Sequence, residues 1–239
     1  PLLSLLVSGG HTEIVLVEEF GKYSIIGQTR DDAAGEAFDK VARMLDLPYP
    51  GGPEISKLAS AARASEFEWS GRAFSSKDKS KSEEIRGPEN SLVRAEQLTF
   101  PRPMLHSGDF DFSFSGLKTA ALYYIRDNPI KSDDDKKAIA CEFENAVVEV
   151  LTTKTLKALK KYSAKTLIVG GGVSANALLK ETLTQKIKSH DKKIKVHFPT
   201  QSLATDNALM IAIAGYFQYQ KKKPSKNSRL LKAKGNLLL

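Results

Sequence analysis

Cysteine is nearly absent from this 239-residue sequence: Cys141 is the single one, so no disulfide can form within the chain. Long hydrophobic runs are also absent, because no apolar stretch approaches the ~18 residues that a membrane span requires. Residues 1–7 are apolar but lack a basic leader and a small-residue cleavage site, so they predict a buried strand and no signal peptide. We therefore expect a cytoplasmic globular protein that does not enter a membrane.

Several catalytic signatures are missing as well. The sequence has no His-Glu-x-x-His zinc-protease motif, no Gly-x-Ser-x-Gly nucleophile elbow and no Walker phosphate loop. A transition metal needs several ligands together, and none of the four histidines has a spacing that pairs it with Asp206. Hydrolase interpretations therefore lose ground.

Positive charge is in excess, since 36 Lys and Arg residues face 28 Asp and Glu residues and give a formal net charge of +8. Residues 221–239 contain a run of lysines and arginines without an acidic residue. Such a tail is more often a solvated end than a binding element. It is nevertheless compatible with an anionic partner such as RNA.

The N-terminal third alternates between strand and helix patterns. Apolar segments at 2–7, 13–18 and 23–28, separated by glycine turns, predict an antiparallel meander. An apolar stripe of helical period then predicts a helix over 34–45, followed by a proline- and glycine-rich break at 48–53. A second helix is expected to end near residue 64.

Three carboxylates accompany the first of these helices. Asp32, Glu36 and Asp39 follow each other at helical spacing, so we expect them to share one side of it. A solvated position is the commoner outcome for a carboxylate on a polar helix face. The alternative is a role in ligand binding, which spacing alone does not decide.

The middle of the chain contains a polar stretch of mixed charge at 68–98, which indicates an inserted surface loop. The pattern then becomes strand-like over 110–118, before a helix that opens near Ser115. Ser132 is expected to cap a long helix, with three aspartates in its first turn.

The last third predicts a strand, helix, strand, helix alternation, which is typical of an α/β sheet with ligands at the carboxyl ends of its strands. The expected strands are 166–169 and 194–198, and the expected helices are 174–188 and 203–219. Gly170 and the segment 200–206 would both emerge at that edge. We therefore expect the functional site there.

Two glycine turns could approach a ligand closely. Gly9 and Gly10 lie between two strands, where backbone N–H groups can reach a phosphate or carboxylate, although on this feature alone an ordinary hairpin turn is the preferred interpretation. Asn176, after the second turn, offers an amide donor and a carbonyl acceptor. Asp206 lies at the expected start of the last helix, where an N-cap is the usual role of a carboxylate and a metal ligand is the alternative.

Seven short motifs follow one another along nearly the whole chain. Together they resemble the tRNA threonylcarbamoyl transferase (TsaD/Gcp) family. The motifs occupy residues 6–12, 31–40, 49–53, 100–103, 112–119, 171–176 and 205–207.

This resemblance implies an α/β fold of the actin-like, Hsp70 and sugar-kinase (ASKHA) superfamily. It implies that residues 1–239 form a partial family domain whose N-terminal lobe would precede Pro1. The polar stretch 68–98 is then an insertion, and 221–239 is a basic tail.

The family transfers the threonylcarbamoyl group of threonylcarbamoyl-AMP to N6 of adenosine 37 in tRNAs that read ANN codons, and AMP leaves. The resemblance implies an acyltransferase that works with partner subunits and with tRNA as its acceptor. It implies no catalytic side chain in this chain, since the protein mainly positions two reactants. The substrate-binding positions that it implies are Leu6, Val7, Ser8, Gly9, Gly10, Asp39, Gly52 and Asn176.

The resemblance also implies one divalent metal ion, iron or alternatively zinc, with Asp206 as a ligand. In the family such an ion grips the threonyl end and polarises the acyl group. Its two histidine ligands, spaced His-x-x-x-His, would lie upstream of Pro1. A lone Asp206 is expected to bind metal poorly, and these residues alone are expected to be inactive.

Two other interpretations remain. The first is a noncatalytic actin-like interaction subunit of the same tRNA-modification complex, against which the presence of Asp39, Asn176 and Asp206 weighs. The second is an actin-like small-molecule kinase, for which the sequence offers no convincing catalytic base.

Overall fold

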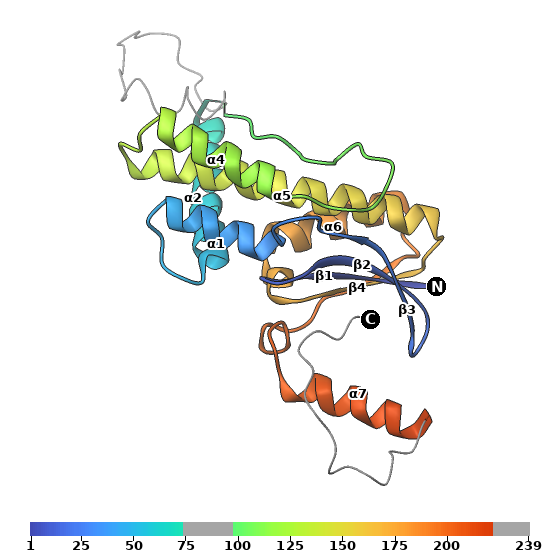
Figure 1. Cartoon of the computed structure of the whole chain (residues 1–239). Coiled ribbons are helices and arrows are strands. Elements are labelled where there is room, and N and C mark those ends of the chain that lie inside the picture. Colours follow the sequence, from blue (N-terminus) through green and yellow to red (C-terminus); the bar gives the residue numbers. More distant parts are fainter. Residues whose placement is uncertain (74–97, 222–239) are drawn as a thin grey trace, which may run out of the picture.

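A five-stranded mixed sheet forms the centre of the molecule (Figure 1). The computed structural model describes residues 1–73 and 98–221. In space the strands run in the order β3-β2-β1-β4-β5. Their bounds are β1 Leu2–Val7, β2 Thr12–Glu19, β3 Lys22–Gln28, β4 Thr166–Gly170 and β5 Lys195–His197.

The predicted antiparallel meander is confirmed. β1 pairs antiparallel with β2, and β2 pairs antiparallel with β3. Within β1 the buried residues alternate with partly exposed ones, so Leu3, Leu5 and Val7 are fully buried. A strand whose side chains alternate in this way has one face on the core.

The second half of the sheet is parallel. β1 pairs with β4 so that Leu6 lies opposite Gly170, and β4 pairs in parallel with β5. The chain segments that follow β1, β4 and β5 therefore leave the sheet at the same edge. This confirms the expected α/β class and the expected position of the glycine turns.

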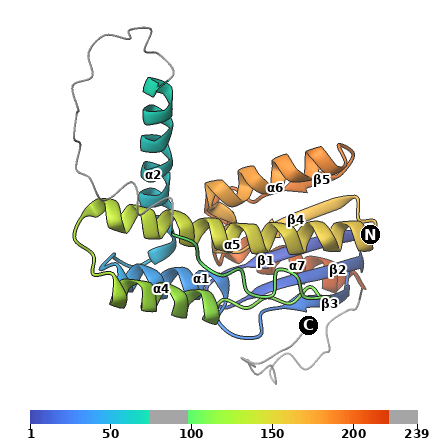
Figure 2. The same cartoon turned by 90° about the horizontal axis from the view of Figure 1, so that it is seen from above.

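Helices cover one face of the sheet, as Figures 1 and 2 show. The ring of Phe38 in helix α1 (Ala34–Met44) packs edge to face on the ring of Phe143 in helix α5 (Asp133–Lys161), with the centroids 5.2 Å apart. The helices are α1 Ala34–Met44, α2 Gly51–Ala73, α4 Ser115–Asp127, α5 Asp133–Lys161, α6 Ala177–His190 and α7 Ala208–Lys221, with short 3-10 turns at Gly172–Ala175 and Gln201–Leu203.

The long helix α5 begins as predicted. The Ser132 hydroxyl accepts a hydrogen bond from the Asp135 N–H, and the Asp135 carboxylate accepts one from the Ser132 N–H, which completes a capping box. Asp133 and Asp134 lie in the same first turn. Their charges suit the positive end of the helix dipole.

Two expectations for the middle of the chain are corrected. Helix α2 runs to Ala73, so residues 68–73 belong to it and not to the inserted loop, whose residues 74–97 lie outside the described chain. The strand-like pattern over 110–118 yields one isolated bridge between Thr29 and Phe112. Phe112 and Phe114 are fully buried, so the alternation reflects side-chain packing, without a further strand.

The end of the described chain also differs from expectation. A short turn at 201–203 and helix α7 from Ala208 replace the single predicted helix over 203–219. α7 has no buried residue and lies away from the covered face of the sheet. It contacts the hairpin of β2 and β3 through Phe217 and Phe20, whose ring centroids are 4.9 Å apart. No helix within the described residues is long and apolar enough to span a membrane.

Candidate functional site

The loop after β1 is a tight turn held by its own serine. The Ser8 hydroxyl accepts hydrogen bonds from the N–H groups of Gly10 (3.2 Å) and His11 (3.0 Å). The Ser8 N–H donates to the His11 carbonyl at 2.8 Å, which closes the turn. The predicted hairpin is therefore present, with Gly9 and Gly10 exposed at its tip.

Two other chain segments pack against this loop through glycines. A Cβ on Gly35, in the first turn of α1, would lie 2.7 Å from the Ser8 carbonyl oxygen. A Cβ on Gly171, directly after β4, would lie 2.3 Å from the Val7 carbonyl oxygen, and Gly171 has a φ of +87°. Only glycine fits such contacts. The loop after β1, the start of α1 and the turn after β4 consequently form one contiguous surface.

Asp39 extends this surface toward α2. Its carboxylate accepts a hydrogen bond from the Gly51 N–H at 2.7 Å, and Gly51 is buried against α1. Gly52, the next residue, is partly exposed. The solvated position that is commoner for such a carboxylate is therefore not observed for Asp39. Its side chain instead holds the N-terminus of α2 beside α1.

Asn176 lies at the same edge, but its side chain is already engaged. Its Oδ1 accepts a hydrogen bond from the Leu179 N–H at 2.8 Å and so caps α6, which begins at Ala177 and not at Ser174 as predicted. Its Nδ2 donates to the Ser56 hydroxyl (2.9 Å) and to Glu144 Oε1 (2.7 Å). Asn176 thus joins α2, α5 and α6.

Glu144 was missed by the sequence analysis. It is 1% exposed, and its other oxygen accepts a hydrogen bond from Arg63 Nη2 at 2.6 Å. A buried carboxylate is stable only when it is paired and hydrogen-bonded. The sequence does contain one indication of this burial, because Glu144 is the charged residue between Phe143 and Val147, two members of the apolar stripe of the predicted helix.

Four glycines of these segments face open space. A Cβ on any of them would meet no heavy atom within 4 Å. The four are Gly9, Gly10, Gly52 and Gly172. The loop after β1, the start of α2 and the turn after β4 therefore each combine a backbone packed closely on a neighbouring segment with backbone that faces open space. Such an arrangement can offer backbone N–H groups to an anionic or polar ligand.

Asp206 is not joined to this surface by any hydrogen bond or ion pair among the described residues. It is exposed, and the helix cap that it was expected to provide comes from Asn207, whose Oδ1 accepts from the Met210 N–H at 3.1 Å. No group of three His, Cys, Asp or Glu side chains in residues 1–73 and 98–221 could hold a metal ion. A single carboxylate does not fit a metal site by itself.

Asp32 and Glu36 serve the fold. Asp32 precedes α1 and forms ion pairs with Lys40 (2.8 Å) and Lys118 (3.0 Å), while Glu36 pairs with Lys40 at 2.9 Å. Burial opposes ionisation of Asp32, but the hydrogen bonds and charges of the two lysines lower its pKa. Of the three carboxylates predicted on one side of the helix, Asp32 and Glu36 therefore share Lys40 as a partner, and only Asp39 borders the open glycines.

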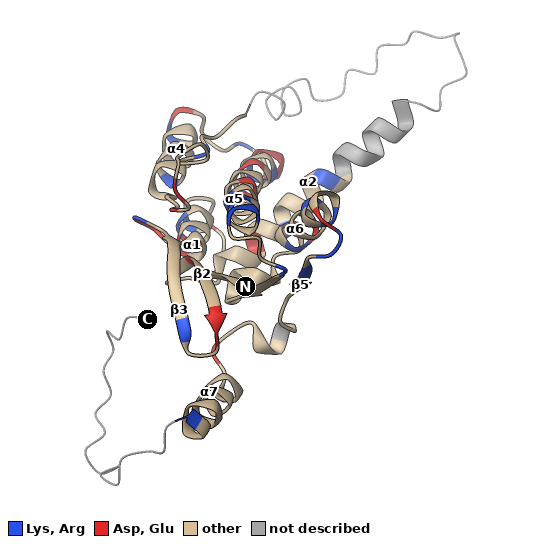
Figure 3. Cartoon of the chain, turned by 90° about the vertical axis from the view of Figure 1, so that its right-hand side faces the viewer, with Lys and Arg blue, Asp and Glu red and all other residues tan. Residues whose placement is uncertain are grey.

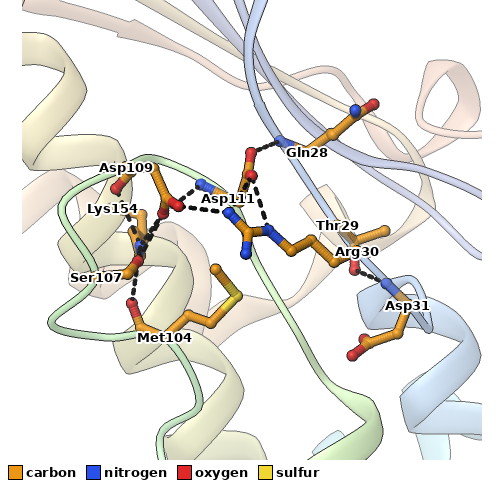
Figure 4. A network of polar contacts seen from close by, with 9 residues as sticks. All are labelled: Gln28, Thr29, Arg30, Asp31, Met104, Ser107, Asp109, Asp111 and Lys154. Atoms are coloured by element: carbon orange, nitrogen blue, oxygen red, sulfur yellow. Dashed lines mark hydrogen bonds and ion pairs between the residues drawn. The ribbon is translucent and has the colours of Figure 1, made fainter.

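A second polar network holds the segment 104–111 against the end of β3 and against α5 (Figure 4). Arg30 donates from Nε to Asp111 (2.9 Å) and from Nη2 to Asp109 (2.7 Å). The fully buried Lys154 of α5 contacts the Ser107 hydroxyl and donates to the Asp109 carbonyl at 3.0 Å. Burial lowers the pKa of Lys154 against the opposing effect of Asp109. This network lies at the end of β3, so we assign it to the fold.

Comparison with known proteins gives one consistent result. A family model described as tRNA N6-adenosine threonylcarbamoyltransferase matches residues 1–82 and 70–213. Proteins of that name include one from Thermosipho africanus, 45% identical over 224 residues and 92% of this chain. Others are from Endomicrobium trichonymphae, 42% identical over 92% of this chain, and Clostridium perfringens strain SM101, 42% identical over 100% of it. The chain spans 57%, 55% and 60% of the lengths of these three relatives, in the order given.

Proposed function

Because this chain belongs to the tRNA N6-adenosine threonylcarbamoyltransferase family, we propose that it acts in transfer of the threonylcarbamoyl group of threonylcarbamoyl-AMP to N6 of adenosine 37 in tRNAs that read ANN codons. The three relatives described above are transferases by name. The comparisons give no support to a noncatalytic interaction subunit.

The reaction is an acyl transfer with two positioned reactants. N6 of adenosine attacks the carbamoyl carbon of the adenylate, and a C–N bond forms. The bond from that carbon to the phosphate oxygen breaks, AMP leaves with the oxygen, and N6 loses a proton to solvent. Holding both reactants in a reactive orientation supplies much of the acceleration in such a step.

One observation supports this function above the others: Gly9, Gly10, Gly52 and Gly172 all face open space while their neighbours pack on one another. We propose that Leu6, Val7, Ser8, Gly9 and Gly10 line the adenylate, together with Asp39 and Gly52. The side chain of Val7 is fully buried, so Val7 would do so through its backbone alone. Backbone N–H groups in these turns suit its phosphate, and the carboxylate of Asp39 suits a hydroxyl or amino group of the ligand.

For Asn176 the contacts favour an indirect role. Its amide and carbonyl are both used within the protein, by Ser56, Glu144 and Leu179. We therefore propose that Asn176 fixes the turn at 171–175, whose backbone faces the ligand, and that it does not itself donate to the adenylate.

The metal remains a proposal from family membership. Asp206 would supply one ligand to a divalent ion, iron or alternatively zinc, which when bound would act as a Lewis acid toward the acyl group. The described residues do not complete a metal site. We propose that two histidines outside residues 1–239 supply the further ligands, as the family resemblance implies.

Family membership also suggests the complete fold, the cellular location and the partners of this chain. The sheet order β3-β2-β1-β4-β5 with helices on one face is consistent with half of an actin-like (ASKHA) fold, and residues 1–239 would form a partial domain of that kind. We propose a cytoplasmic protein that works with partner subunits which make the adenylate. The basic tail from Lys221 onward would add salt-sensitive contacts to tRNA.

The test is a transfer assay with the protein in its full natural length. Threonylcarbamoyl-AMP and a tRNA that reads ANN codons are supplied, partner proteins are added, and modified adenosine is measured by mass spectrometry of tRNA nucleosides. We expect Asp39→Asn to lower kcat/KM at least tenfold, equivalent to about 1.4 kcal/mol. The control Asp127→Asn, an exposed residue paired with its neighbour Arg126, should leave the rate unchanged. No modified adenosine from the wild type would refute the proposed function.

A further inference from the structure

Within the described residues, positive charge is concentrated in one stretch. Between residues 157 and 195 there are ten lysines, and the only acidic residues are Glu181 and Asp191. All ten lysines are exposed. This stretch is separate from the basic tail at 221–239, and it lies wholly within the described chain.

The fold brings nine of these lysines to one edge of the molecule. The end of α5 leads into β4, and the end of α6 leads into β5. The starts of β4 and β5 lie side by side, since the Lys195 N–H donates to the Lys165 carbonyl at 3.0 Å. We call this surface the lysine edge; its members are Lys157, Lys160, Lys161, Lys165, Lys186, Lys188, Lys192, Lys193 and Lys195. Figure 3 views it directly, with blue segments on α5, α6 and β5.

Most of these charges have no opposing partner. Asp191 is the one carboxylate beside them, and it lies 3.5 Å from Lys165. The N–H of Lys193 donates to Asp191 and lowers its pKa, with further help from the charge of Lys165. For six lysines, no ion pair or hydrogen bond of the ammonium group joins them to another described residue. They are Lys160, Lys186, Lys188, Lys192, Lys193 and Lys195.

Several basic side chains elsewhere in the described chain are instead paired with carboxylates. Arg30 pairs with two aspartates, Arg102 with Glu142 and Glu149, and Lys40 with Asp32 and Glu36. Like charges held together without counter-charges repel one another, which costs stability that an external polyanion can recover.

We propose that the lysine edge binds the phosphodiester backbone of the tRNA substrate. The inference rests on the proposed function for the identity of the RNA. The ends of four elements contribute the lysines, so the surface suits an extended polyanion better than a single phosphate. Among exposed large apolar side chains in the described residues, only Ile168 falls within 157–195. A membrane surface would be expected to combine basic and apolar residues.

The location is compatible with simultaneous occupancy of the candidate site. The open glycines lie at the carboxyl ends of β1 and β4, whereas the lysine edge lies at the amino ends of β4 and β5. A strand as short as β4 separates these two edges by about 15 Å. Double-stranded nucleic acid carries one charge per ~1.7 Å of its axis, so a stem of that length presents about nine phosphates. One tRNA could therefore reach both edges.

The test compares two variants that lose the same charge. Lys186→Gln/Lys192→Gln/Lys193→Gln alters the lysine edge, and Lys22→Gln/Lys131→Gln/Lys136→Gln alters positions outside it. Binding of tRNA to the full chain is measured by fluorescence anisotropy between about 50 and 200 mM salt. We expect the first variant to bind about tenfold more weakly at the lower salt, with the slope of log K against log salt reduced by two to three. The control should stay within about twofold of the wild type.

Three outcomes would overturn the proposal. Equal weakening in both variants would mean that only net charge matters. Unchanged binding in the first variant would place the RNA elsewhere, and the proposed function would stand if AMP still binds the chain and transfer persists. Loss of binding to phosphatidylglycerol vesicles without loss of tRNA binding would assign the lysine edge to a membrane. A wild type that binds neither AMP nor tRNA would instead refute the proposed function. Circular dichroism and urea unfolding establish that both variants are folded.

Discussion

Asp31 and Ser115 are 84 positions apart in the sequence, yet the carboxylate of Asp31 accepts hydrogen bonds from both the hydroxyl (2.7 Å) and the N–H (3.2 Å) of Ser115. It also accepts from the Phe114 N–H at 2.8 Å and the Ser113 hydroxyl at 2.5 Å. Asp31 therefore caps α4 from a distant part of the chain. Two of the motifs recognised in the sequence, 31–40 and 112–119, meet in this contact.

The first prediction concerns acid stability. Burial by itself would raise the pKa of Asp31, but the hydrogen bonds from Ser113 and Ser115 outweigh it and lower the pKa below its usual 3.8. The stabilisation is therefore present above that value and is lost as the pH falls through the lower pKa of the folded state. Asp31→Ala should cost about 1 kcal/mol near neutral pH, and the cost should shrink in acid below pH 3.8.

Urea unfolding of the wild type and Asp31→Ala across this pH range checks the prediction. Asp206→Ala removes an exposed carboxylate without a hydrogen bond or ion pair to the described chain, so it should change the free energy of unfolding by less than about 0.5 kcal/mol. A cost of Asp31→Ala that does not vary with pH would contradict the assigned role.

The second prediction separates two adjacent glycines. At Gly171 a Cβ would lie 2.3 Å from the Val7 carbonyl oxygen, and φ is +87°. Gly171→Ala should therefore destabilise the fold by about 2 kcal/mol or more. Gly172→Ala meets no atom within 4 Å, so it should unfold with nearly the wild-type midpoint. Equal losses of stability in urea for the two variants would contradict the close contact between Gly171 and the end of β1.

The third prediction uses two asparagines that cap helices. Asn176→Asp keeps an acceptor for the cap of α6 but places a carboxylate where Nδ2 now donates to Glu144 at 2.7 Å. Repulsion between the two carboxylates should cost about 2–3 kcal/mol and weaken AMP binding. Asn207→Asp also keeps its cap. It loses the exposed hydrogen bond from Nδ2 to the Thr205 carbonyl (2.9 Å) but faces no carboxylate in the described chain, so it should cost less than about 1 kcal/mol.

Calorimetric titration with AMP and urea unfolding measure the two effects of Asn176→Asp. Ser56→Ala removes one acceptor of Asn176 and leaves Glu144 in place, so it should weaken AMP binding with a loss of stability of at most about 1 kcal/mol. If Asn176→Asp and Ser56→Ala both bound AMP with wild-type affinity, a positioning role for Asn176 would be excluded.

The fourth prediction concerns the buried Lys154. Its ammonium group is fully buried and contacts Ser107 and Asp109, while Asp109 retains Arg30 as a second partner. Lys154→Met should therefore cost about 1–2 kcal/mol, less than the loss of a fully buried pair. The exposed Lys131→Met should cost less than about 0.5 kcal/mol in the same urea titration. A stabilised Lys154→Met variant would show that burial of the charge outweighs its hydrogen bonds.

The fold class could be predicted because it depends on local patterns. The alternation in residues 2–28, the helical stripe from Ala34 and the cap at Ser132 each report on a nearby backbone conformation, and each is confirmed. For residues 110–118 the helix expected to open near Ser115 is confirmed, since α4 begins there, but the expected strand before it is wrong. Burial of Phe112 and Phe114 produces the same alternation as a strand, so periodicity cannot separate the two.

The candidate site was predicted only as a set of positions. Gly9, Asp39 and Asn176 were named from motifs, and the structure places them on adjoining segments. Glu144 and Ser56 could not be found, because a charged residue in a helix has no sequence signal for the partner that it meets. The roles of Asn176 and Asn207 as caps likewise depended on where each helix begins, which the sequence located within a few residues.

The sequence by itself determined the α/β class, the order of its elements, the concentration of positive charge and the family to which the chain belongs. These properties follow from composition, short-range periodicity and motifs. Tertiary structure alone decided which carboxylates pair with lysines, which asparagine amide is already engaged and which glycines face open space. Those outcomes depend on contacts between residues distant in the chain, and the free energy of such contacts comes from close packing and burial, which no local pattern records.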